Sequence, residues 1–241
     1  MSINRRRVRA IVRKELRDFR RNRSLTTGMA IIPVLFCVQP AVTVFTLDPA
    51  ASATLRQQHV LLYMLGIPAL VPSVIAAYSV VGEREQGTLE PVLTTPIRRE
   101  ELLLGKAVAA LLPSLAVAYA VYGLFLASVE FFAAPAVASA LIRPPDLLAQ
   151  VVFTPLLAGW SIWTAIMIST RSNDIRVVQQ FALLASLPSI AVTTLVGFNV
   201  IKVSLVAGLV AAAALLLLNW MGWRFASAMF DRERLITGTN G

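Results

Sequence analysis

Six long stretches without a charged residue decide what this chain can fold into. As an α-helix, which rises about 1.5 Å per residue, each stretch is long enough to cross about 30 Å of hydrocarbon. The composition agrees, because 57% of the residues are hydrophobic and only 15% are charged, with a mean hydropathy of +0.71. We therefore predict an all-α, polytopic membrane protein with six transmembrane helices. The stretches cover residues 24–47, 57–82, 107–129, 147–170, 177–201 and 203–223.

Two connections between the predicted spans carry signals of their own. The apolar run 131–142 is too short to cross the bilayer and contains Pro135, so we place it at the outer interface or dipping into it. It belongs to a predicted outer loop of residues 130–146. The fifth and sixth spans are separated by only a few residues around Lys202, which predicts a tight hairpin.

The 22 basic residues are distributed unevenly between the two sides that six spans define. The N-terminus, the segment 83–106, the segment 171–176 and the C-terminus share one side and hold 19 of them, against Arg56, Arg143 and Lys202 on the other. Lys and Arg are retained on the cytoplasmic side during insertion. We therefore expect both termini to be cytoplasmic and the chain to lie in the plasma (cytoplasmic) membrane. This asymmetry explains the high pI without a nucleic-acid partner.

The first 23 residues predict an amphipathic helix on the cytoplasmic face of the lipid bilayer. Apolar residues fall on one helical face, and arginines and a lysine occupy the rest. The apolar stripe would lie at the acyl boundary while the basic side chains meet anionic head groups. A topology signal without a defined position is the alternative. The stripe consists of Val8, Ile11, Val12, Leu16 and Phe19.

The segment 83–106 is a charged island between two apolar spans. Gly87 is expected to interrupt the helix that leaves the second span, and Leu89, Val92 and Leu93 then follow at helical spacing. Thr95 followed by Pro96 predicts the N-cap and first position of the next helix. The short apolar face is suited to docking into a groove on a soluble partner. Leucines that fold back on the membrane fit the spacing equally well.

Four short motifs occupy this island: Glu83-Arg84-Glu85, Gly87-Thr88-Leu89-Glu90, Leu93-Thr94-Thr95-Pro96 and Glu101-Leu102-Leu103-Leu104-Gly105-Lys106. With the basic start and the six spans, they resemble the signature of the ABC type-2 (ABC-2) permease family, the membrane subunits of ATP-driven exporters. The resemblance covers the whole chain. It departs at Lys202, where the short connection leaves little room for the outer re-entrant helices that many members carry.

The resemblance implies two domains: an elbow helix over residues 1–23 and a six-helix permease domain over 24–241. Val8, Ile11, Val12, Leu16 and Phe19 would belong to the elbow helix. The segment 83–106 would contain a coupling helix between the second and third spans, and an ABC ATPase subunit would dock there. Its docking residues would be Glu83, Arg84, Glu85, Gly87, Thr88, Leu89, Glu90, Val92 and Leu93.

We predict that the chain itself is not an enzyme. Gly105-Lys106 is followed by Ala107 and lacks the earlier glycine of a phosphate-binding loop, so ATP and Mg²⁺ would bind the partner ATPase and this chain would bind no cofactor. The single Cys37 and the single His59 predict neither a disulfide nor a metal site. We expect His59 to be solvated at the outer interface and assign it no chemistry. No catalytic residue is predicted.

The predicted function is the translocation pathway of an ABC exporter, formed by a dimer and driven by a separate ATPase. A homodimer is the simplest form, and a heterodimer with a related permease stays open. The apolar spans suit a hydrophobic or amphipathic cargo better than a bare ion. The alternative function is a membrane scaffold or sensor that recruits a soluble partner through the same segment.

Overall fold

The computed structural model describes residues 4–46, 55, 58–78, 81–85, 97–172, 174–201 and 204–229, without the side chains of Ser24, Arg84 and Glu85. The described residues form helices with short connections, and no strand occurs among them. They contain six helical segments long and apolar enough to cross a membrane. The prediction of an all-α chain with six spans is therefore confirmed.

The spans follow one another in the order expected from the charge-free stretches. The first is α2 (Arg23–Thr46), and the second combines the 3₁₀ helix η2 (Val60–Leu65), α4 (Gly66–Ala77) and the start of α5 (Val81–Glu85). The other four are α7 (Arg99–Phe132), α9 (Pro144–Arg171), α10 (Ile175–Gly197) and α11 (Leu205–Met229). Two further helices flank them, α1 (Arg5–Arg21) and α8 (Pro135–Leu141).

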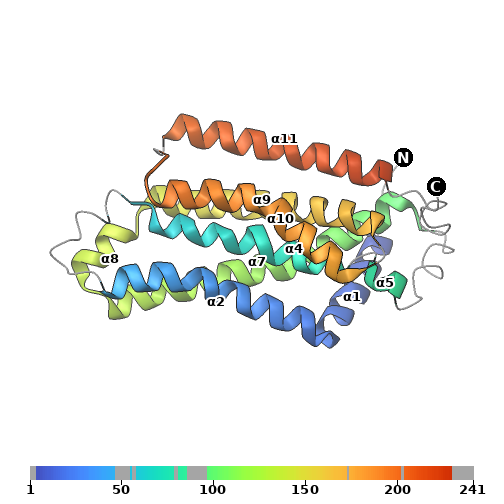
Figure 1. The fold of residues 1–241 in the computed structure, drawn as a ribbon, viewed down its shortest axis with the longest axis horizontal. Helices are drawn as coiled ribbons and strands as arrows, with labels where there is room; N and C mark the ends of the chain where they lie inside the picture. The colour runs from blue at the N-terminus through green and yellow to red at the C-terminus, as the bar shows by residue number, and fades with distance from the viewer. Residues whose placement is uncertain are drawn as a thin grey trace.

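The spans lie side by side along the long axis of the molecule (Figure 1). Helices α1 and α5 lie at one end of this bundle, which we call the α1 end, and α8 lies at the opposite end, the α8 end. Helix α4 runs through the middle and packs against α2, α7, α9 and α10. Apart from Ser73, α4 contains only apolar residues and glycine, so other helices can surround it without any charge being buried.

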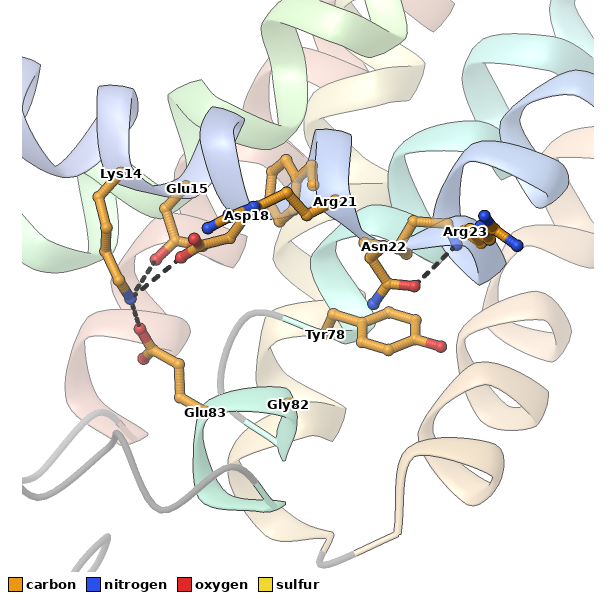
Figure 2. A pocket seen from close by; sticks show the side chains of 11 residues that line it. Lys14, Glu15, Asp18, Arg21, Asn22, Arg23, Tyr78, Gly82 and Glu83 are labelled. Carbon is orange, nitrogen blue, oxygen red and sulfur yellow. Dashed lines mark hydrogen bonds and ion pairs between the residues drawn. The ribbon is translucent and has the colours of Figure 1, made fainter.

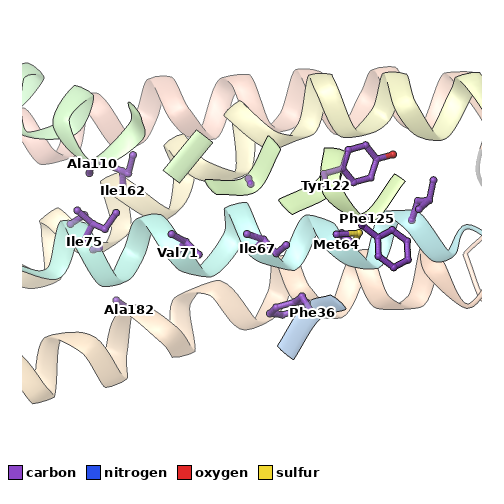
Figure 3. Close-up of a cluster of buried hydrophobic side chains, with 14 of the residues drawn as sticks. Phe36, Met64, Ile67, Val71, Ile75, Ala110, Tyr122, Phe125, Ile162 and Ala182 are labelled. Carbon is purple, nitrogen blue, oxygen red and sulfur yellow. The ribbon is translucent and has the colours of Figure 1, made fainter. Parts of the chain in front are cut away.

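The core follows α4. Ile67, Val71 and Ile75, spaced four residues apart, are almost completely buried and lie along its length (Figure 3). Helix α9 approaches α4 closely enough for two hydroxyl groups to reach its backbone. The Ser161 Oγ donates to the carbonyl of Ala69 at 2.6 Å, and the Ser169 Oγ donates to that of Ala77 at 2.9 Å. Small polar residues allow such close packing of membrane helices.

The start of α7 differs from the prediction. The helix begins at Arg99 with Arg98 as its N-cap residue, so the N-cap predicted at Thr95 is wrong. The Glu101 carboxylate accepts the backbone N–H of Arg98 at 3.2 Å, which stabilises the first turn. At the other end, α7 continues to Phe132 and α9 already begins at Pro144. The predicted outer loop 130–146 is therefore largely helical, with α8 inside it.

The fifth and sixth spans do not pack as the predicted hairpin. Helix α10 ends at Gly197, and Asn199 adopts the left-handed conformation with φ 59°, which an asparagine tolerates well. The connection is short, but α11 packs mainly against α9. The short connection keeps the end of α10 near the start of α11. Side-chain contacts nevertheless place α11 against α9.

His59 is also placed differently from our expectation. Its side chain is only 16% exposed, and its Nδ1 lies 2.6 Å from Oδ1 of Asp146. The expectation of a solvated histidine is therefore wrong. The partner lies 87 residues away in the sequence, so local composition at the start of the second span gave no sign of it.

Helix α11 packs along α9, while most of its apolar surface is exposed. The Asn219 Nδ2 donates to the carbonyls of Leu156 at 2.9 Å and Leu215 at 2.8 Å. One turn further, Gly222 leaves room for Trp163, whose ring meets that of Trp223 edge to face at 5.4 Å. An amide and an indole pair thus fix a helix that is otherwise in contact with little of the bundle.

Replacing Gly222 by alanine should destabilise the protein by about 1–3 kcal/mol, because overpacking forces neighbouring groups to shift. The new Cβ would lie 2.8 Å from Cβ of Trp163. Gly208→Ala on the same helix is the matched control, since a Cβ there meets nothing within 4 Å. The measurement is the unfolding midpoint of the purified protein on titration with sodium dodecyl sulfate. Equal shifts for the two variants would contradict the proposed role of the Trp163 contact.

Candidate functional site

The structure describes only part of the predicted docking segment. Glu83 is described completely, whereas Arg84 and Glu85 are described only as backbone of α5. The other predicted docking residues lie outside the described residues, and a role in docking stays a prediction for the whole set. Those outside the described residues are Gly87, Thr88, Leu89, Glu90, Val92 and Leu93.

Glu83 belongs to a buried ion cluster that joins three helices. The ammonium group of Lys106 on α7 donates to Glu83 Oε2 at 2.7 Å and to Glu15 Oε1 on α1 at 3.0 Å. The Lys106 side chain is fully buried, with 0% exposed. An isolated buried ammonium is strongly disfavoured, so Lys106 requires both carboxylates close by. The cluster therefore draws α1 and α5 onto the first turns of α7.

Lys14 closes this cluster from the solvent side. It donates to Glu83 Oε1 and lies 3.6 Å from Glu15 and 3.8 Å from Asp18 (Figure 2). Partial burial of Lys14 opposes its charge, but the hydrogen bond to Glu83 and the nearby carboxylates of Glu15 and Asp18 outweigh this and raise its pKa. Lys14 therefore stays charged and neutralises the second oxygen of Glu83. The two lysines and the two glutamates form a balanced set of charges.

Close contact between α1 and α7 depends on Gly105. A Cβ at this position would lie 2.6 Å from Cγ2 of Ile11, so only glycine leaves the isoleucine in place. Two turns towards the start of α1, the Glu101 carboxylate accepts the backbone N–H of Asn4 at 2.9 Å and pairs with Arg7 at 3.4 Å. Three residues of α7 thus contact α1. Glu101 supplies an acid, Gly105 leaves room for Ile11, and Lys106 supplies a buried base.

The apolar stripe of α1 faces this contact. Ile11 and Phe19 are buried in the core of the bundle, and Val12 and Leu16 pack against it, while Val8 is half-buried. The sequence predicts this stripe at the acyl chains of the lipid, but Ile11 and Phe19 contact protein. Glycine at position 105 and the ion cluster explain this difference, because they let α1 approach α7 directly.

Helix α5 is fixed on its other side by the end of α9. The Ser169 Oγ donates to the Ala77 carbonyl and accepts the backbone N–H of Val81 at 3.1 Å, so one hydroxyl joins the end of α4 to the start of α5. Val81 and Ala77 are buried against Val178 of α10. The second span therefore continues into α5 as a supported unit.

A cavity of about 760 Å³ opens beside the ion cluster. It lies between α1, the start of α2 and the junction of α4 and α5, and Glu15, Asp18, Tyr78 and Gly82 contribute to its lining. Figure 2 shows the Lys14 ammonium between the carboxylates of Glu15 and Glu83 at one side of it. No group of three or more His, Cys, Asp or Glu side chains that could hold a metal ion occurs among the described residues.

The arrangement is mechanical in character. The second span enters the undescribed residues 86–96 through α5, the third span leaves them through the start of α7, and both are bound to α1. A force applied between the two spans would therefore act on α1, α5 and α7 together.

The sequence contained the members of this cluster without revealing their pairing. Glu101 and Lys106 lie in one of the motifs that carry the family resemblance and Glu15 lies in the basic start, but the sequence did not predict contacts among them. The sequence does contain one indication of a buried ion pair, since Glu15 and Asp18 are the only acids on the otherwise basic α1. An acid that faces the apolar side of such a helix is expected to have a partner.

Replacing Lys106 by methionine should destabilise the protein by about 3–5 kcal/mol, because it leaves the buried Glu15 and Glu83 short of positive charge. Lys14→Met removes a second lysine from the same glutamate, but that side chain is 43% exposed and its loss should cost about 1 kcal/mol or less. The midpoint of detergent-induced unfolding distinguishes the two. A larger effect for Lys14→Met would show that the buried pair does not hold the cluster together.

Comparison with known proteins agrees with the fold and the motifs. The chain matches the family model of the ABC-2 family transporter proteins over residues 9–228, which include most of α1, the ion cluster and the six spans except for the last residue of α11. No curated protein matches it. The chain is a multi-pass membrane protein that belongs to the ABC-2 family of transporter proteins.

Proposed function

We propose that this chain is the membrane subunit of an ATP-driven exporter and that a separate ABC ATPase binds the segment 83–106. Family membership makes it a permease of ABC transport, and such permeases work with an ABC ATPase. The observation that carries the proposal is the ion cluster of Lys106 with Glu15 and Glu83. It anchors both sides of the proposed docking segment to one amphipathic helix.

The ion cluster would allow the segment 83–106 to transmit movement from the ATPase to the membrane spans. When the ATPase subunits close on ATP, they would pull on the residues between α5 and α7. Because Glu83 and Lys106 are bound to each other and to α1, the pull would reach the second and third spans at the same time. The packed core around α4 would carry it along the bundle, since protein interiors are close-packed and transmit strain.

The α1 end is proposed to face the cytoplasm of a plasma membrane. It carries the ten basic residues of the N-terminal segment and the two described ends of the charged segment 83–106, α5 and the start of α7. Basic residues favour the cytoplasmic side, where the ATPase also resides. The α8 end would then face outward, and cargo would leave there.

Two copies are proposed to form the pathway, identical in the simplest case. The core of one bundle is filled by the side chains around α4. Helices α2, α10 and α11 expose wide apolar surfaces that can meet lipid or a second copy. A pathway between two such bundles would be lined mostly by apolar side chains, which suits a hydrophobic or amphipathic cargo. ATP and Mg²⁺ would bind only the partner ATPase.

Replacing Leu89 by aspartate should abolish binding of the ATPase, because a charge would replace an apolar anchor of the proposed docking face. The partner to use is an ABC ATPase from the same genome, and an ATPase encoded in an adjacent reading frame is the first choice. The two proteins are expressed together, the permease is purified through a tag, and the ATPase that accompanies it is quantified. We expect a loss of at least about tenfold, the factor that 1.4 kcal/mol represents.

Ser139→Asp is the control variant, since Ser139 is exposed on α8 at the opposite end and should not affect binding. Undiminished co-purification of the ATPase with Leu89→Asp would refute the docking assignment. If the complex assembles but ATP drives no transport of any cargo from reconstituted liposomes, the scaffold or sensor function is the correct one.

A further inference from the structure

A second charged cluster lies at the α8 end of the bundle, and neither the motifs nor the proposed function accounts for it. Asp146, in the first turn of α9, is buried with a side chain only 2% exposed. The His59 Nδ1 lies 2.6 Å from its Oδ1, while Arg143 donates to its Oδ2 from Nε at 3.1 Å and from Nη2 at 2.6 Å. Both oxygens of the carboxylate are therefore bound.

The cluster joins the ends of three spans. Arg143 also donates from Nη2 to the backbone carbonyl of Gln58 at 2.8 Å, just before η2. The backbone N–H of His59 donates to the carbonyl of Gly197 at the end of α10 at 3.1 Å. The second, fourth and fifth spans thus meet at this point through polar contacts, whereas apolar packing joins them deeper in the bundle.

Two side chains near this junction each have one buried polar atom without a partner among the described residues. The Oε1 of Gln150, one turn along α9 from Asp146, and the hydroxyl of Tyr122 on α7 are buried and have no hydrogen-bond partner among the described residues. Gln150 is 1% exposed and Tyr122 is 6% exposed. Figure 3 shows the Tyr122 hydroxyl directed from the core towards the α8 end.

Such groups are unusual in a closed bundle, because a buried polar atom without a partner destabilises the state in which it is buried. Apolar residues at positions 122 and 150 would stabilise this arrangement better. The two polar groups would instead be satisfied in a second arrangement, in which water or a polar part of a cargo reaches them. Their position directly below the junction indicates where the bundle would open.

We propose that His59, Arg143 and Asp146 form a releasable latch that closes the α8 end of the bundle over a polar interior containing Gln150 and Tyr122. On release, His59 and Arg143, which are 16% and 23% exposed, can bind water in place of Asp146, whereas the 2% exposed Asp146 needs water to enter as the end opens. A junction made of apolar side chains would expose those side chains to water when it opened, which is unfavourable. This inference extends the proposed function, in which movement from the α1 end must reach the opposite end.

The test measures the reactivity of a cysteine placed beneath the latch. The full chain, with Cys37→Ser, carries Leu62→Cys and is reconstituted in lipid nanodiscs, where a water-soluble maleimide reaches both ends. Leu62 is 4% exposed and packs with Leu65 and Leu157, one turn below His59. We expect slow labelling with the latch intact and labelling about tenfold faster with His59→Ala or Asp146→Asn, the factor that 1.4 kcal/mol represents.

Two comparisons separate release of the latch from general unfolding. His59→Asn should restore slow labelling, because an amide can donate from the position of Nδ1. Leu103→Cys, fully buried at the α1 end, should stay protected in every variant. Slow labelling of Leu62→Cys in both latch variants, failure of His59→Asn to restore protection, or equally faster labelling at position 103 would each overturn the latch.

A second arm tests the proposed function separately. In the complex with the ATPase, a non-hydrolysable ATP analogue should accelerate labelling of Leu62→Cys when the latch is intact. If the latch variants expose Leu62→Cys but the nucleotide has no effect, the latch stands and the proposed coupling of ATP binding to this end is wrong.

Discussion

The burial of one ammonium group constrains the cytoplasmic architecture proposed for this protein. Lys106 lies inside the first turns of α7, completely enclosed, and a charge in that position is tolerated only with opposite charges in contact. Glu15 and Glu83 come from two other helices, so the ammonium determines where α1 and α5 lie. Without it, α1 would have only its apolar stripe to position it, and that stripe fits a lipid surface as well as a protein surface.

The helices differ in how many neighbours they are bound to. Helix α4 is enclosed by α2, α7, α9 and α10. Ser169 links its end to α5, and Glu83 of α5 pairs with Lys14 of α1. Movement at the α1 end therefore shifts a connected body of helices. Helix α11 contacts mainly α9, through Asn219, Gly222 and the tryptophan pair, and contributes Ala226 to the buried core.

The sequence predicted the six spans well, because the length of an apolar stretch is a local property that sets the length of a helix in a bilayer. It could not predict the pairs that organise them. Lys106 and Glu15 are 91 residues apart, and His59 and Asp146 are 87 apart, so no local pattern links them. The same limit explains why His59 was expected to be solvated and α11 to pair with α10. All the docking residues, Glu83 to Glu85 included, stay predictions drawn from the family motif.

The two charged clusters have different physical characters, and that difference suits different roles. At the α1 end, Lys106 is fully enclosed, so separating it from its carboxylates would leave a bare charge in the protein; this junction is built to stay intact while it moves. At the α8 end the enclosed group is Asp146, but its partners Arg143 and His59 reach the surface, so water that enters as this end opens can replace them. A rigid junction at one end and an exchangeable one at the other would direct any movement of the packed core towards opening the α8 end, because the contacts there are the first to yield.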